Sequence, residues 1–358
     1  MIPKFDPKEL KVKGEYPGFI GRPSTPIYDF PVLPKEAYVA AIKRQPILQL
    51  TGAEWTTFAP QAYPDNVARA FIFEAVPLDP AKYGGKDMFG IEWEYVPVTG
   101  GSMVKPGNPL LSNANEWVEK VVWPDVDSWD FTESAKANKE RLNDGRFHNF
   151  WILNGYFERL ISFMDFEGAA IAMIDDDQKD AIKALFEKLT DLYIKIVDKF
   201  IEYYHAEGFN INDDWGSQIA PFFSPATAME MCVPAMKRLT DHIHSRGCYV
   251  DLHSCGKIER QVPAMIAAGF DSWYGMKMND TQMLYEKYAD KIMIGVMPDQ
   301  YDPETASEEE QRAAAAKFVE KFCQPGKAAT VNQYGSAVLT PAYREELYRL
   351  SRIKFSEE

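Results

Sequence analysis

The chain has little cysteine and little positive charge. Its four cysteines in 358 residues are too few for a disulfide framework, which favours a reducing, cytoplasmic location. The formal net charge is -14, whereas a protein that binds nucleic acid or an anionic membrane surface is expected to be basic where it binds. We therefore expect neither nucleic acid nor a membrane among its partners.

Segments that direct a chain to a membrane are also missing. Residues 1–10 contain no apolar stretch of the kind found in a secretory signal. No apolar run reaches the roughly 18 residues that a membrane-spanning helix needs. The hydrophobic fraction of 46% and the charged fraction of 26% are typical of a globular protein with a sizeable core.

The chain changes character near residue 147. Residues 1–130 are dense in proline and aromatics, which predicts an irregular N-terminal extension that also contains the first elements of the fold. Over 147–358, short apolar runs alternate with amphipathic helical patterns, the longest of which covers 178–205. Such alternation is typical of parallel strands joined by helices.

Two architectures fit this alternation, an open doubly wound sheet and a closed barrel. The two usual nucleotide-binding motifs of open sheets, Gly-x-Gly-x-x-Gly and Gly-x-x-x-x-Gly-Lys-Ser/Thr, do not occur after any predicted strand. Their absence favours an α/β fold of the (β/α)8 TIM-barrel type with an N-terminal elaboration. We predict that residues 1–358 form a single domain and that 147–358 carry the active site.

Polar residues follow successive predicted strands, and in a barrel the active site lies at these strand ends. A chain with only five histidines places one of them here, beside a cysteine. The residues at the predicted strand ends are Asn154, Asp213, Asp214, Trp215, His253, Cys255, Asn279, Asp299 and Tyr334.

The pair His253 and Cys255 is the strongest candidate for chemistry. Imidazole and thiolate are both zinc ligands, and residues two apart point the same way at a strand end. The alternative is a buried histidine beside an inert cysteine. Two ligands are also too few for zinc, and Cys323 follows a helix on the side of the barrel away from the strand ends. Cys232 and Cys248 are predicted to be core or helix-start residues.

Asp213 and Asp214 are candidates for acid–base catalysis or metal binding, and alternatively form turn or cap hydrogen bonds. Trp215 and Tyr334 are predicted to line an apolar wall for a flat substrate, with ordinary core packing as the alternative. Asp299 is predicted to be either a substrate-binding carboxylate or a turn former.

Several segments together resemble a known family. They are residues 89–93, 123–127, 155–158, 213–216, 223–225, 252–256 and 295–299. Their order and spacing resemble the uroporphyrinogen decarboxylase superfamily, and within it the branch of corrinoid-dependent methyltransferases. The resemblance implies a (β/α)8 barrel whose substrate cavity lies at the strand ends.

The chain departs from that branch at one position. The resemblance implies a zinc held by His253 and Cys255 and by a later cysteine after the last strand. The later position falls in residues 332–335, Asn-Gln-Tyr-Gly, where there is no cysteine. Thiolate-rich zinc sites suit the activation of a thiol, so this departure favours ether demethylation instead. Two possibilities follow: a carboxylate of Asp213, Asp214 or Asp299 completes the zinc site, or the metal is absent and the cavity acts by acid–base catalysis.

The resemblance thus implies a methyltransferase of an anaerobic demethylation system. It would move a methyl group from a methoxylated, aromatic compound to the cobalt of the cobalamin carried by a separate corrinoid protein. Two alternatives stay open. A metal-free decarboxylase or lyase would need arginines in the cavity, for which Arg22 and Arg159 are the candidates. A barrel that binds a ligand without catalysis would have the same fold.

Overall fold

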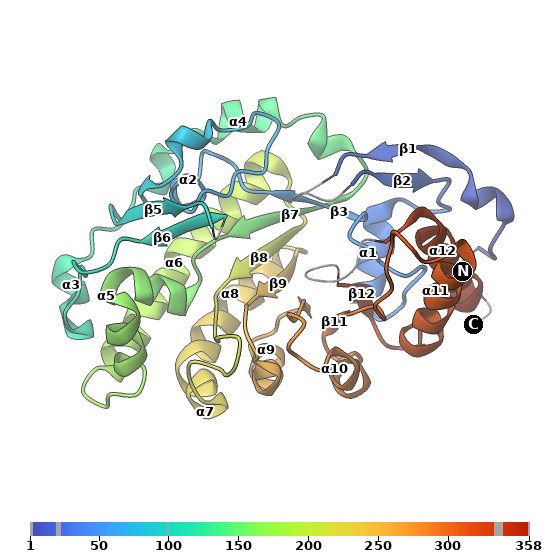
Figure 1. Cartoon of the computed structure of the whole chain (residues 1–358). Coiled ribbons are helices and arrows are strands. Elements are labelled where there is room, and N and C mark those ends of the chain that lie inside the picture. The colour runs from blue at the N-terminus through green and yellow to red at the C-terminus, as the bar shows by residue number, and fades with distance from the viewer. Residues whose placement is uncertain (1–2, 19–22, 99, 333–338, 357–358) are drawn as a thin grey trace. The chain divides into compact units, whose positions relative to one another are not determined.

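The computed structural model describes residues 3–18, 23–98, 100–332 and 339–356, and the chain divides into two compact units (Figure 1). The central unit comprises residues 57–144 and 148–270. The terminal unit comprises residues 1–56, 145–147 and 271–358. In both units, parallel strands alternate with helices, as the sequence pattern predicts.

Most of the residues in α-helices belong to the central unit. Two of its strands, β3 and β7, begin in the residues assigned to the terminal unit. Its strands are β3 (Trp55–Phe58), β4 (Gly85–Lys86), β5 (Glu92–Val96), β6 (Gly101–Val104), β7 (Phe147–Ile152), β8 (Gly208–Asn212) and β9 (Tyr249–His253). Its helices are α2 (Pro64–Ala68), α3 (Trp117–Lys120), α4 (Phe131–Ala137), α5 (Tyr156–Ala172), α6 (Lys179–Tyr204), α7 (Pro225–Thr227), α8 (Val233–Ser245) and α9 (Val262–Ala267).

Strands β7, β8 and β9 lie side by side as a parallel sheet, green to yellow in Figure 1. The register pairs Asn212 at the end of β8 with His253 at the end of β9. Across one face of this sheet, Asn149 Nδ2 donates to Asp251 Oδ2 at 2.9 Å. Because side chains alternate along a strand, Trp151 and His253, each two residues further on, project from the same face.

The opposite face of this sheet is covered by α6. Buried residues of α6 recur every three or four positions, for example at Ile182, Leu189 and Phe200, as the amphipathic pattern predicts. The rings of Phe200 and Tyr204 lie 5.1 and 5.2 Å from that of Phe150 on β7. Helix α6 therefore covers one face of the sheet, and the candidate polar residues lie on the other face, from which Trp151 and His253 project.

The predicted N-terminal elaboration consists of antiparallel strands. In the central unit, β5 pairs with β4 and β6, and it buries Trp93 between the exposed Glu92 and Glu94. The indole Nε1 of Trp93 donates to Asp87 at 3.0 Å. In the terminal unit, β1 pairs with β2.

The terminal unit contains three parallel strands in the order β12-β11-β10, together with the β1–β2 pair. Its strands are β1 (Val12–Tyr16), β2 (Thr25–Tyr28), β10 (Ser272–Trp273), β11 (Met293–Val296) and β12 (Ala329–Val331). Its helices are α1 (Pro34–Ile42), α10 (Thr281–Tyr288), α11 (Glu308–Phe322) and α12 (Pro341–Ser356).

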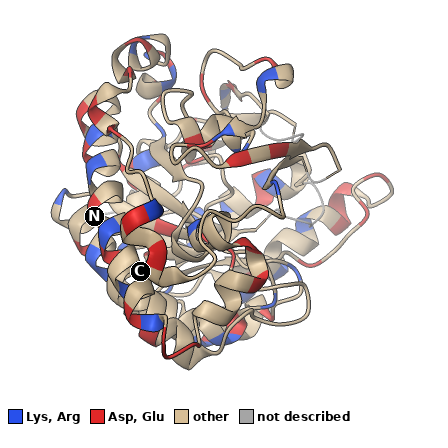
Figure 2. Ribbon diagram, turned by 90° about the vertical axis from the view of Figure 1, so that its left-hand side faces the viewer, with Lys and Arg blue, Asp and Glu red and all other residues tan. Residues whose placement is uncertain are grey.

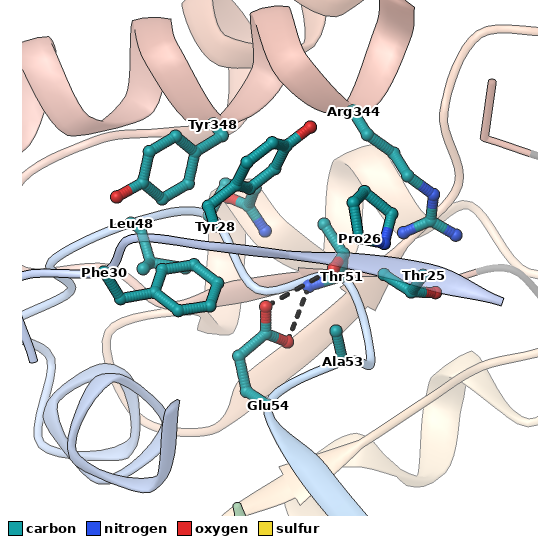
Figure 3. Close-up of a pocket in the computed structure, with 11 residues that line it drawn as sticks. Thr25, Pro26, Tyr28, Phe30, Leu48, Thr51, Ala53, Glu54, Arg344 and Tyr348 are labelled. Atoms are coloured by element: carbon teal, nitrogen blue, oxygen red, sulfur yellow. Dashed lines mark hydrogen bonds between the residues drawn. The ribbon is translucent and has the colours of Figure 1, made fainter. Parts of the chain in front are cut away.

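A small hollow in the terminal unit is closed by packed side chains (Figure 3). The rings of Tyr28 and Tyr348 lie 5.1 Å apart at its edge, and Glu54 accepts a hydrogen bond from the backbone N–H of Thr51 at 2.9 Å. The hollow has a volume of about 20 Å³, which is room for about one water molecule. It is therefore too small for a cofactor or an organic substrate.

Acidic and basic residues are interspersed along the ribbon (Figure 2). On the surface of the central unit, for example, Arg238 pairs with Glu187 at 3.1 Å and with Asp191 at 2.6 Å. Among the helices of the described ranges, none combines the length and the apolar character needed to cross a membrane.

Candidate functional site

The structure brings together three of the predicted residues, Asp214, His253 and Cys255. They follow β8 and β9, whose last residues are paired, so the two connecting loops start next to each other. Cys255 Sγ lies 3.4 Å from His253 Nε2, and His253 Nε2 lies 3.8 Å from Asp214 Oδ1. One ligand atom from each residue lies within 4.8 Å of the other two. The His253 and Asp214 side chains are 36% and 35% exposed, so a small molecule can reach both.

Backbone hydrogen bonds hold the two loops together. The N–H of Cys255 donates to Asp214 Oδ1 at 2.6 Å, and the N–H of Trp215 donates to Ser254 Oγ at 2.9 Å. Gly256 lies against the other loop with φ +98°, and an added Cβ would lie 2.5 Å from the backbone of Gly216. The glycine after Cys255 therefore permits the close approach of the loops that sets the distances between the three candidate ligands.

This close approach predicts the effect of Gly256→Ala. We expect the free energy of unfolding to fall by about 2–4 kcal/mol. The added Cβ would clash with the backbone of Gly216, and alanine, unlike glycine, is strained at a positive φ. The matched control is Gly247→Ala, because Gly247 has φ +75° but no atom within 4 Å of an added Cβ. Urea unfolding measures both variants, and equal losses would mean that the clash with Gly216 contributes nothing.

The donor set fits zinc. Zinc binds imidazole nitrogen and carboxylate oxygen at about 2.0–2.2 Å and thiolate at about 2.3 Å in tetrahedral geometry, which places its ligand atoms about 3.3–3.6 Å apart. The separations of 3.4 Å and 3.8 Å in the structure are close to this range. Three protein ligands with a mixed nitrogen, oxygen and sulfur set leave one position for a substrate, as catalytic zinc sites do.

Burial favours the uncharged forms of two of these ligands. It raises the pKa of the Cys255 thiol, and the negative charge of Asp214 acts in the same direction. Burial also lowers the pKa of His253, although Asp214 opposes this shift. A thiol in such surroundings does not ionise alone near neutral pH, whereas a coordinated divalent cation would supply the charge that stabilises the thiolate.

Asp213 is turned away from these three residues and holds the start of α5. It is fully buried, and it accepts hydrogen bonds from the backbone N–H of Glu158 at 2.8 Å and from Trp215 Nε1 at 2.9 Å. Burial raises its pKa to about 6, although these hydrogen bonds oppose the shift. An added Cβ on Gly155 would lie 2.5 Å from that of Asp213, which explains the glycine before α5. The catalytic role predicted for Asp213 stays a prediction, and its contacts are those of a helix cap.

The remaining predicted residues are not among the three ligands of the cluster found in the described ranges. Trp215 is fully buried, with its indole held by Asp213, so it packs in the core of the central unit. Asp299 belongs to the terminal unit, where it is 53% exposed and pairs with Lys321 at 3.3 Å. Tyr334 lies outside the described residues. Cys323 is buried, with its thiol 3.4 Å from Gln49 Oε1, while Cys232 and Cys248 are buried as predicted.

Two charged residues beside the site were not predicted from the sequence. Arg69 Nη1 donates to Glu158 Oε1 at 3.0 Å and to Asn154 Oδ1 at 2.8 Å. Burial raises the pKa of Glu158 to about 8, against the opposing charge of Arg69, and the carboxylates of Asp214 and Asp213 add to the increase. Glu158 lies in segment 155–158, which is part of the family resemblance. The sequence motif does not show that Glu158 is buried, and burial is what raises its pKa.

Arg159 has a structural role rather than the one considered for it. Its guanidinium is fully buried and forms ion pairs with Asp65 and Asp87, which are also buried. It is therefore not available to bind a substrate carboxylate, as the decarboxylase alternative requires. Arg22, the other candidate for that role, lies outside the described residues.

Comparison with known proteins agrees with this architecture. A family model of uroporphyrinogen decarboxylase matches residues 159–331, which confirms the predicted resemblance to that superfamily. Among solved structures, a methyltransferase from Methanosarcina mazei superposes with a TM-score of 0.58 at 16% identity and covers 91% of this chain and 99% of that chain. This similarity confirms the (β/α)8 barrel-like fold. The IOLI protein with a binding zinc atom superposes less well, with a TM-score of 0.32 at 10% identity over 64% of this chain and 81% of that chain. No curated protein matches.

Proposed function

We propose that this protein is a methyltransferase that moves a methyl group from a methoxylated aromatic compound to the cobalt of a separate corrinoid protein. The observation that carries the proposal is the meeting of Asp214, His253 and Cys255 at two adjacent strand ends, where one ligand atom from each lies within 4.8 Å of the other two and all three donor types are ones that zinc binds. The family match and the methyltransferase of similar fold support the reaction class.

The reaction requires stabilisation of the oxygen that leaves the methyl group. The bond between the methyl carbon and the ether oxygen breaks, the electron pair of the reduced cob(I) form of the corrinoid would make the new bond to the methyl carbon, and the pair left on the ether oxygen takes up a proton. Zinc held by Asp214, His253 and Cys255 would supply Lewis-acid stabilisation of that oxygen. A carboxyl group that keeps its proton near neutral pH suits the protonation step, and Glu158 is such a group.

Glu158→Gln tests this proton donor. We expect kcat to fall roughly 100-fold, because general acid catalysis contributes on the order of 10² to 10⁴ in rate. Since Glu158 is protonated below its pKa of about 8, wild-type kcat should fall as the pH rises through about 8, and the variant should lose this decrease. Glu202→Gln, on α6, is the control. A variant with the wild-type kcat and the wild-type pH profile would remove Glu158 from the mechanism.

The function itself is tested in an anaerobic assay. Methoxylated aromatic compounds are the donors, and the acceptors are free cob(I)alamin and a purified corrinoid protein. We expect the demethylated phenol and the methylated corrinoid to form in equal amounts, with zinc present in the enzyme. Absence of transfer from any ether, amine or thioether donor would overturn the proposal, and carbon dioxide release without zinc would favour a decarboxylase.

A further inference from the structure

Three aromatic side chains gather beside the candidate site within the central unit. Phe71 and Phe73 follow α2, and Trp151 lies on β7. The ring of Trp151 lies 5.1 Å from Phe73 at an interplanar angle of 88° and 6.0 Å from Phe71. All three side chains are only partly buried, whereas a tryptophan of the core such as Trp215 is completely buried. We call Phe71, Phe73 and Trp151 the aromatic cluster.

The aromatic cluster is on the same side of the sheet as the candidate ligands. Trp151 projects from the face of β7 that carries Asn149, whose amide bonds Asp251 across the sheet. His253 projects from that face two residues after Asp251 on β9. Partly exposed rings on this face offer flat apolar surface to an aromatic molecule that reaches His253.

Arg69 lies on the same segment as Phe71 and Phe73. It forms two side-chain hydrogen bonds within the described ranges, both from Nη1, to Asn154 and Glu158. Its guanidinium also stands 5.0 Å from the centre of the Trp93 ring, and its Nε is buried without a partner among the described residues. A guanidinium has five N–H donors, so most of them remain for another acceptor.

Contacts connect Arg69 to the candidate ligands. Glu158, whose side chain accepts a hydrogen bond from Arg69, donates its backbone N–H to Asp213, the residue before Asp214. Asn154, the other hydrogen-bond partner of Arg69, follows the end of β7 as Asp213 follows the paired end of β8, so the guanidinium lies at neighbouring strand ends. The other charged groups nearby are carboxyl groups, which would repel an anionic substrate unless a cation received it.

We propose that Arg69 and the aromatic cluster make this enzyme selective for aromatic methyl ethers that also carry a carboxylate. The inference rests on the proposed function and specifies the substrate class. The aromatic cluster receives the ring of the donor, and the N–H groups of Arg69 that are not bonded to protein receive its carboxylate. Arg69 is a specificity-determining residue in this account. Because it also bonds Glu158, its replacement can change kcat for both donors, so the comparison rests on KM.

The test compares methoxybenzoates with the corresponding methoxybenzyl alcohols, which have the same methyl ether but no charge. For the wild type we expect KM to be at least 10-fold lower for the acid than for the alcohol. In Arg69→Gln, the KM for the acid should rise roughly 10- to 100-fold, because hydrogen bonds between charged groups are strong. The KM for the alcohol should stay within about 3-fold. Arg69→Lys, which keeps the charge, should recover part of the affinity for the acid.

Two further measurements separate a binding role from a folding role. Calorimetric titration of methoxybenzoate into the zinc-loaded protein, without any corrinoid, should give heat for the wild type and for Arg238→Gln but not for Arg69→Gln. The zinc content of Arg69→Gln should match that of the wild type.

The possible outcomes are distinct. Equal KM values for acid and alcohol in the wild type, or an equal rise for both in Arg69→Gln, would overturn this inference and leave the methyltransferase proposal standing. Binding of methoxybenzoate without methyl transfer from either donor would overturn the proposed function, while its dependence on Arg69 would still support the carboxylate subsite.

Discussion

Replacing Cys255 by alanine should release the zinc and reduce methyl transfer by roughly a thousandfold or more. Cys255 Sγ and His253 Nε2 lie 3.4 Å apart, and no other thiol belongs to the three-residue cluster found among the described residues. Loss of the thiolate leaves two ligands, which is too few for tight zinc binding. Several kcal/mol of transition-state stabilisation would be lost with the metal, and about 4 kcal/mol corresponds to a thousandfold in rate.

The control for this substitution is Cys248→Ala in the same unit. Cys248 is buried, whereas Cys255 is only partly buried, and the Cys248 thiol bonds the carbonyl oxygen of Ala206 at 3.3 Å and lies outside the ligand cluster. We expect Cys248→Ala to retain a full equivalent of zinc in elemental analysis and nearly the wild-type rate. If Cys255→Ala retained zinc and activity to the same degree, the proposed ligand set would be wrong.

Replacing Arg159 by methionine should reduce the free energy of unfolding by about 3–5 kcal/mol. The substitution removes the positive charge of a buried ion group and leaves the carboxyl groups of Asp65 and Asp87 without it. Arg159, Asp65 and Asp87 have fully buried side chains, and the guanidinium pairs with both carboxylates. The rings of Phe89 and Phe163 lie 4.8 and 5.8 Å from the guanidinium, so its surroundings are largely apolar.

The loss should depend on pH in a defined direction. Burial raises the pKa of Asp65, and the charge of Arg159 opposes that shift. Without Arg159, the folded-state pKa of Asp65 would lie further above its unfolded value, so the stability is present at low pH and is lost as the pH rises through that folded-state pKa. Arg159→Met should therefore be more destabilised at pH 8 than at pH 5 in urea unfolding.

Arg238→Met is the surface control for this prediction. Arg238 also bridges two carboxylates, Glu187 and Asp191, but all three side chains are 44–50% exposed. An exposed ion pair contributes at most about 1 kcal/mol. A loss below about 1 kcal/mol in Arg159→Met would show that the buried ion group does not stabilise the central unit.

The regular part of the fold was predictable because its elements follow simple periods. The helix predicted over 178–205 is α6 (Lys179–Tyr204), since its apolar residues recur at helical spacing. Helix α5 was not predicted. Its residues from Tyr156 to Met164 are mostly buried, so no amphipathic pattern marks them, and Asp165 interrupts the helix with φ 57°.

The candidate site was predictable only in part. The sequence identifies His253 and Cys255 by their motif and by their place at a strand end. It does not distinguish Asp213 from Asp214, because only the paired ends of β8 and β9 decide which carboxylate faces His253 and which caps α5. Arg69 comes from the irregular N-terminal part, where no period connects it to residues 80 to 190 positions later, so tertiary structure alone reveals it.

X-ray absorption at the zinc edge of the purified protein tests the central claim most directly. The account predicts one zinc per chain with one sulfur neighbour at about 2.3 Å and nitrogen or oxygen neighbours at about 2.0–2.2 Å. The zinc signal itself should be lost in Cys255→Ala, whereas zinc with its sulfur neighbour should remain in Cys248→Ala. A zinc shell without sulfur, or protein that binds no zinc when the metal is supplied, would contradict the assignment of Asp214, His253 and Cys255 as its ligands.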